Sequence, residues 1–157
     1  MTDFRVDVRD RSGAGIDLAE AAAAARFLLA QLRLHPATRL SVSYVGLDEM
    51  ARLHIEHMSE PGATDVLSFP MDELRAPAEG ESAEPGELGD IVICPDFAAA
   101  QAAEAGQPVA DELDLLLCHG ILHLLGHDHA EPEEHRVMFD LQGQLLSRWR
   151  EHSGRRA

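Results

Sequence analysis

Four histidines between positions 119 and 129 restrict how the second half of this chain can fold. His119 and His123 are four residues apart, so on a helix their side chains lie one turn apart on the same face. Two imidazoles in this arrangement can bind one metal ion. A third ligand must then come from chain that leaves the helix and turns back, so the stretch predicts a helix that ends soon after His123.

Gly126 predicts where that helix ends, because glycine adopts the left-handed conformation that terminates helices at little cost. His129, three residues later, can then face the other two histidines. The alternative third ligand is His127, which follows the same helix face only if the helix runs unbroken through Gly126. Three neutral histidines and a water molecule form a catalytic zinc arrangement. We therefore predict one zinc ion bound by His119, His123 and His129.

Position 120 argues against a protease. Zinc proteases with this ligand spacing carry a general-base glutamate directly after the first histidine, and here that residue is Gly120. Without the carboxylate, the usual mechanism has no proton acceptor beside the metal-bound water. A zinc peptidase would need a glutamate from elsewhere in the chain, and it stands only as a third hypothesis.

The size and cysteine content favour one cytoplasmic domain. A chain of 157 residues with 45% hydrophobic content suits a single core. No apolar run has the length of a membrane span, and the N-terminus lacks the pattern of a signal peptide. Cys94 and Cys118 are not spaced as a disulfide framework. We expect no contact with a membrane, and two buried structural cysteines rather than metal ligands.

The formal net charge of −15 limits how the chain can meet a nucleic acid. Proteins that bind nucleic acids without regard to sequence have a basic face. An RNA substrate would therefore need a local basic patch or a partner that delivers it. The same charge suits contact with basic proteins.

Hydrophobic periodicity predicts interleaved strands and helices. Strands are expected at 4–8, 40–44, 64–70 and 88–94, and helices at 17–34, 47–58, 95–105, 109–125 and from 132 onward. Pro70 suggests that the third strand lies at an edge of the sheet or ends there, and Asp17 is the expected cap of the first helix.

These elements predict an α+β (mixed α/β) fold in a single small domain, residues 1–157. It has about four strands in one sheet and about five helices, with the metal site at the end of a buried helix. Residues 74–87 show no hydrophobic periodicity and are expected to form an exposed loop. Residues 152–157 are expected to be a frayed tail.

Three segments together resemble the bacterial YbeY family: the histidine stretch 119–129, Thr64-Asp-Val-Leu-Ser-Phe-Pro70 and Leu88-Gly-Asp-Ile-Val-Ile93. The likeness covers roughly residues 40 to 147, and the histidine stretch is its most specific part. The resemblance implies a metal-dependent endoribonuclease that acts on single-stranded RNA in ribosomal RNA maturation and ribosome quality control. Its implied partners are ribosomal RNA and proteins of the small ribosomal subunit.

The resemblance also bears on single residues. It implies that His119, His123 and His129 bind the zinc ion, whereas His127 stands where the family commonly has tyrosine. Many members carry an arginine, thought to contact RNA, at the position of Met58 here. That departure leaves two readings open: another cation meets the phosphate, or cleavage is weak or depends on a partner.

Ser68, Asp65 and Asp128 are candidates for positioning the substrate or transferring a proton. Asp65 has a structural alternative as a hydrogen-bonding group at the start of a strand, and Asp128 as a group that orients a ligand histidine. The metal would polarise a phosphoryl oxygen and activate a bound water, or it would assist attack by the 2′-OH of the RNA. A second hypothesis is a non-catalytic ribosome assembly factor whose zinc mainly holds the last turns together.

Overall fold

The computed structural model describes residues 4–58 and 64–154 of the chain. The strands are β1 (Arg5–Asp10), β2 (Arg39–Tyr44), β3 (Val66–Pro70) and β4 (Glu87–Ile93). The helices are α1 (Leu18–Gln31), α2 (Leu47–Met58), α3 (Pro95–Ala105), α4 (Val109–Leu124) and α5 (Pro132–Ser153). The four strands form one sheet, so the predicted α+β fold with four strands and five helices is confirmed.

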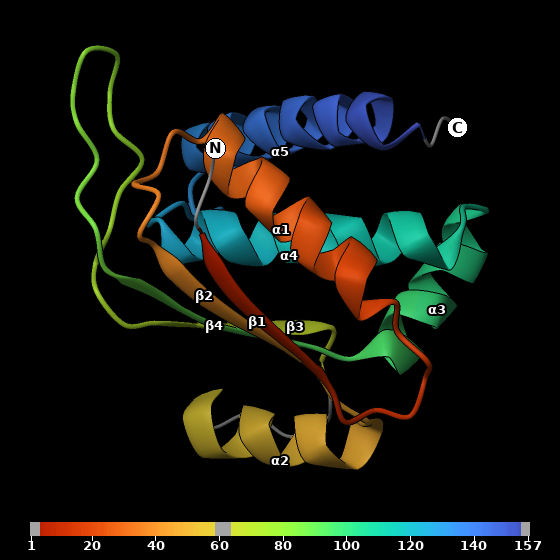
Figure 1. Cartoon of the computed structure of the whole chain (residues 1–157). Coiled ribbons are helices and arrows are strands. Elements are labelled where there is room, and N and C mark those ends of the chain that lie inside the picture. The colour runs from red at the N-terminus through yellow and green to blue at the C-terminus, as the bar shows by residue number, and fades with distance from the viewer. Residues whose placement is uncertain (1–3, 59–63, 155–157) are drawn as a thin grey trace.

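The sheet is mixed, with the strand order β1-β2-β4-β3. β1, β2 and β4 run parallel to one another, and β3 pairs antiparallel with β4 at the edge, as Pro70 predicted. Helices α1, α4 and α5 cover one face of the sheet, and α2 lies on the other (Figure 1). The edge strand β3 is therefore within reach of both α4 and the end of α2.

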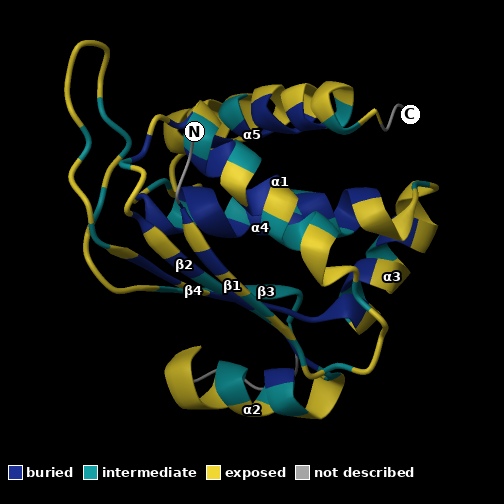
Figure 2. Cartoon of the chain, viewed as in Figure 1, coloured by how far each residue is buried: buried dark blue, intermediate teal, exposed yellow. Residues whose placement is uncertain are grey.

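Helix α4 is the central element of the core. It lies between the sheet and α5, with α1 packed beside it, and most of its residues are buried (Figure 2). Beneath it, β4 contributes Leu88, Ile91 and Ile93, each fully buried, in keeping with the continuous apolar run of that strand. A smaller cluster around Met50 and Val92 fills the space between α2 and the opposite face of the sheet.

Helix α4 packs tightly against the sheet at Gly120. A Cβ atom at this position would lie 2.9 Å from Cγ2 of Ile91 on β4, nearer than side chains pack. Glycine therefore lets the helix backbone settle on the strand. Because Gly120 faces Ile91, His119 and His123 lie to one side of the contact, over β3. The same contact leaves no room for a glutamate at position 120.

The first helix begins where the sequence predicted but ends earlier. Asp17 caps α1 as predicted, and its carboxylate accepts a hydrogen bond from the backbone N–H of Glu20 at 3.0 Å. The helix was expected to reach about Leu34, but it ends at Gln31. Arg33 adopts a left-handed φ of 58°, and the N–H of Leu34 turns back to the carbonyl of Leu29. This turn closes the helix before Pro36.

The loop from residue 71 to residue 86 is largely exposed, as the lack of a period predicted. The frayed tail was expected to begin at His152, but α5 continues through Ser153. The ring of His152 packs 4.7 Å from that of Phe27, which holds this last turn in place. The sequence also places a helix breaker, Pro61-Gly62, after the expected helix 47–58, and these two residues lie outside the described part of the chain. In the described part of the chain, no helix has the length and apolar character needed to cross a membrane.

The contact between Gly120 and Ile91 gives a test of this packing. Gly120→Ala should destabilise the protein by roughly 1–3 kcal/mol, because the added methyl group overpacks the core. Gly143→Ala, in α5, is the matched control: nothing lies within 4 Å of its Cβ position, and alanine should stabilise the helix by up to about 1 kcal/mol. Urea unfolding measures both. Equal stability of the two variants would show that α4 does not rest on β4 at this point.

Candidate metal centre

Two of the predicted ligands project from the last turns of α4. His119 and His123 are both half-buried, and their rings lie 4.6 Å apart between centroids. The Nε2 atoms of the two rings are 3.1 Å apart. Helical spacing thus brings two ring nitrogens to one point, as the sequence predicted.

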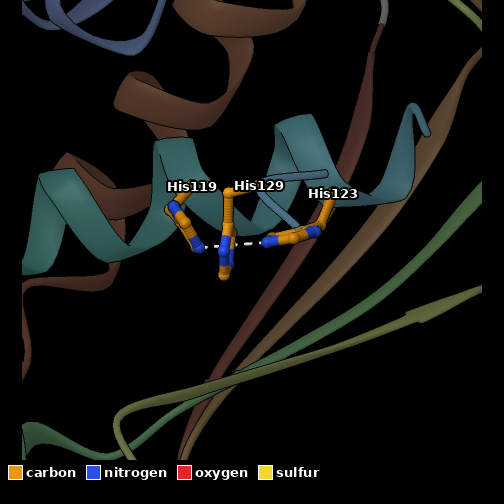
Figure 3. A group of neighbouring side chains, drawn as sticks. All are labelled: His119, His123 and His129. Carbon is orange, nitrogen blue, oxygen red and sulfur yellow. Dashed lines mark hydrogen bonds between the residues drawn. The ribbon is translucent and has the colours of Figure 1, made fainter. Parts of the chain in front are cut away.

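The third histidine arrives through a turn at Gly126. This residue has a left-handed φ of 94°, and the N–H of His127 bonds back to the carbonyl of Leu122 at 3.0 Å. The chain then reverses, and the ring of His129 lies 5.6 Å from His119 and 5.2 Å from that of His123 (Figure 3). The structure therefore brings His129, and not His127, to the other two histidines.

The geometry of the three imidazoles fits a metal ion. Their ligand nitrogens all lie within 4.8 Å of one another. Nitrogen ligands sit roughly 2.0–2.1 Å from zinc, and a tetrahedral angle then separates two of them by roughly 3.3 Å. The 3.1 Å between the Nε2 atoms of His119 and His123 is close to that separation. The half-exposed cluster can take up an ion without a large movement of the helix.

One wall of this site comes from the edge strand. The histidines border a pocket of about 360 Å³ that also contains Met58 from α2 and Asp65 to Ser68 from the start of β3. His129 is the exposed member of the cluster, and all three histidines line this pocket, so the site is accessible from it. A catalytic metal site has the same property, because one position must remain free for water or substrate.

Gln142 orients the first histidine, and the sequence analysis missed it. Its Oε1 atom lies 3.0 Å from Nδ1 of His119, and the side chain is buried. When Nδ1–H donates to this amide oxygen, the lone pair of Nε2 is directed at the site. The available signal was a polar residue on the apolar face of α5, four residues after Met138 and three before Leu145.

The surroundings favour neutral imidazoles. Burial lowers the pKa of His119 below its ordinary value, and the hydrogen bond with Gln142 opposes that change. Burial also lowers the pKa of His123, and the neighbouring rings of His119 and His129 lower it further. Neutral rings offer a lone pair, which a metal ion requires. Burial raises the pKa of Cys118 to about 12, so its thiol stays protonated and is a poor ligand.

Ser68 and Asp65 both line the pocket. The hydroxyl of Ser68 donates to the carbonyl of Gly120 at 3.3 Å, a link between β3 and α4. The carboxylate of Asp65 accepts from the N–H of Val66 at 2.7 Å and from the side-chain amide of Gln101 at 3.3 Å. Both residues are therefore held by the scaffold while facing the histidines.

Asp128 has a different position. Its carboxylate accepts a hydrogen bond from the backbone N–H of His129 at 2.7 Å, and it lines a separate surface pocket with His127 and Val137. The contact stabilises the turn that presents His129. Met58, at the position where the resemblance places an arginine, lines the metal pocket itself and is 46% exposed. The described residues that line this pocket include no arginine.

Comparison with known proteins identifies the family to which this chain is similar. The chain matches the family model described as Endoribonuclease YbeY over residues 11–150. The Endoribonuclease YbeY of Thermobifida fusca is 58% identical over 92% of this chain and 94% of its own length. That of Kineococcus radiotolerans is 53% identical over 90% of this chain and 84% of its own.

A solved structure agrees with the fold. The solution structure of TM1509 from Thermotoga maritima superposes with a TM-score of 0.66 and 24% sequence identity, over 94% of this chain and 90% of that one. At this identity the likeness concerns the fold alone. The family model and the two relatives cover nearly the whole chain, and the chain therefore belongs to the endoribonuclease YbeY family and is a metal-dependent endoribonuclease.

Proposed function

We propose that this endoribonuclease uses one zinc ion, bound by His119, His123 and His129, to cleave single-stranded ribosomal RNA during maturation of the small ribosomal subunit. The observation that carries the proposal is the convergence of three imidazoles on an open pocket in a member of this family. The two cysteines are free and buried, which suits work in the reducing cytoplasm.

The ligand set supports zinc as the metal. Three histidines with one open position are a common catalytic zinc arrangement, and zinc accepts the tetrahedral geometry that these nitrogens can provide. When bound, zinc supplies a Lewis acid that polarises a phosphoryl oxygen and lowers the pKa of a water molecule. The remaining tasks, which are to hold the ligands, place the RNA and move protons, belong to the side chains of the chain itself.

Asp65 and Ser68 are our candidates for placing the RNA and moving a proton. Among the described residues that line the pocket, Asp65 is the one carboxylate, and its negative charge raises the pKa of His119. The hydroxyl of Ser68 lies on the same wall. We assign Asp128 a positioning role, because its carboxylate holds the backbone N–H of His129.

The net charge bears on how ribosomal RNA reaches this site. With a net charge of −15, the chain as a whole repels a polyanion. We propose that basic proteins of the small ribosomal subunit hold the enzyme beside its substrate, because opposite charges steer such contacts. Protein contacts would then replace the basic face that other RNA-binding proteins use.

Two histidine variants test the ligand assignment and the activity together. His123→Ala should lose bound zinc and the cleavage of a single-stranded ribosomal RNA fragment, because it removes one ligand. His127→Ala is the matched control from the same turn, and it should retain both. Zinc content is measured by elemental analysis of identically purified proteins, and cleavage by gel electrophoresis.

Each outcome of that comparison is informative. Equal zinc content in the two variants would refute the choice of His129 over His127. Equal cleavage by wild type and His123→Ala would point to a contaminating nuclease, and absence of cleavage by zinc-loaded wild type would contradict the proposed activity of the isolated chain.

Gln142 should control metal affinity without touching the ion. Gln142→Leu removes the acceptor for Nδ1–H of His119, and loss of such a partner typically weakens metal binding by roughly 10- to 100-fold. Gln144→Leu, at an exposed position of the same helix, is the control. Competition with a zinc chelator measures both affinities. Equal affinities would mean that the hydrogen bond does not orient the ligand.

Zinc affinity should depend on pH in a defined direction. Protons compete with the metal for the ring nitrogens, and free imidazole has a pKa of about 6.5. Because the pKa values of His119 and His123 are lowered, affinity should remain nearly constant down to about pH 6.5 and then fall toward pH 5. Calorimetric titration over this range measures the change. A constant affinity to pH 5 would contradict a site made only of histidines.

A further inference from the structure

Two aromatic side chains lie on the surface of α5 beside the metal centre. His135 and Phe139 are one helical turn apart, and their rings stack with a centroid distance of 4.3 Å and an interplanar angle of 19°. His135 is exposed, and Phe139 is 39% exposed. We refer to this stacked pair as the aromatic platform.

The platform continues the ring cluster of the metal site. The centroid of Phe139 lies 5.8 Å from that of His119 and 6.2 Å from that of His129. The centroid of His135 lies 6.4 Å from that of His129. A group that is bound at the three histidines therefore has an exposed aromatic face as its neighbour.

Phe139 is not part of the hydrophobic core. The buried residues of α5 are Met138, Gln142, Leu145, Leu146 and Trp149. Phe139 follows Met138 by one position, about 100° further around the helix, which puts its ring at the edge of the buried face, beside Leu146 and partly in solvent. Single exposed apolar residues are common on protein surfaces, but this ring lies against two of the three clustered histidines.

The acidic side chains around the platform disfavour contact with the phosphate of a nucleotide but not with its base. Three glutamates, Glu131, Glu133 and Glu134, lie at the start of the helix. Arg136 forms ion pairs with Glu133 and with Asp140, so its charge is compensated. A phosphate is repelled here, whereas the uncharged face of a base is not.

We propose that Phe139, backed by His135, is a platform on which a nucleobase of the RNA stacks while the neighbouring phosphate is held at the metal centre. The inference rests on the proposed function, since it requires RNA at the three histidines. Recognition of single-stranded RNA commonly uses aromatic side chains in this way, and stacking tolerates any base. Phe139 is thus a positioning residue, because one ribose separates the stacked base from the reacting phosphate.

The test compares binding of two oligomers to zinc-loaded, full-length protein by fluorescence anisotropy. One is a labelled 2′-O-methyl oligoadenylate, and the other is the same backbone with abasic residues. Phe139→Ala should weaken binding of oligoadenylate by about 5- to 100-fold, since one stacked base contributes roughly 1–3 kcal/mol. Binding of the abasic oligomer should not change. Val137→Ala, 43% exposed on the same helix, should bind both oligomers as wild type does.

A second variant keeps the inference testable if the alanine variant is poorly folded. Phe139→Trp should restore the affinity for oligoadenylate, and its indole fluorescence should be quenched by oligoadenylate but not by the abasic oligomer. Trp149 is only 3% exposed, so the new tryptophan gives the ligand-dependent signal. Absence of quenching would overturn the platform.

The remaining outcomes separate stacking from other roles. An equal loss of affinity for both oligomers, or loss of zinc from Phe139→Ala, would show that the ring merely supports the histidines. Wild-type protein that binds both oligomers equally would overturn the platform as well. If wild type cleaves ribosomal RNA and Phe139→Ala binds oligoadenylate normally, the platform alone fails. If zinc-loaded wild type neither binds nor cleaves RNA, the proposed function fails with it.

Discussion

The contact between α4 and β4 at Gly120 determines the rest of the site. The helix backbone rests on the side chain of Ile91, where a Cβ atom would lie 2.9 Å away. This contact fixes the rotation of α4 about its own axis, and hence the direction in which His119 and His123 project. A helix seated higher on the sheet would carry the two imidazoles away from the wall that β3 provides. The residue that excludes the protease glutamate is therefore also the residue that places the histidines.

Sequence patterns predicted the parts of the structure that local physics decides. The spacing of His119 and His123, the turn at Gly126 and the edge strand at Pro70 each have a short-range cause, and the structure contains all three. The contact of Gln142 with His119 joins two helices, and the two residues are 23 positions apart in the sequence. No periodicity specifies which buried side chain a given polar residue will meet, so only the fold shows it.

Two helix boundaries differ from those that the sequence predicted. α1 was expected to reach Leu34, but Arg33 takes a left-handed conformation that propensity does not predict for arginine. At the other end of the chain, His152 was assigned to a frayed tail, yet its ring packs against that of Phe27 from α1. A local backbone turn therefore ends α1, whereas a tertiary contact holds the last turn of α5, and helix propensity decided neither boundary.

The two edges of the sheet also have a consequence for the behaviour of the protein in a crowded cell. An unpaired strand edge is a template for pairing with another chain, and proteins protect such edges with charges and proline. The outer strand β1 exposes Arg5, Asp7 and Arg9 in alternation, and β3 closes with Pro70, which has no N–H to donate. Both edges are thus poor sites for adding a foreign strand. This protection disfavours intermolecular aggregation while leaving β3 free to border the metal pocket.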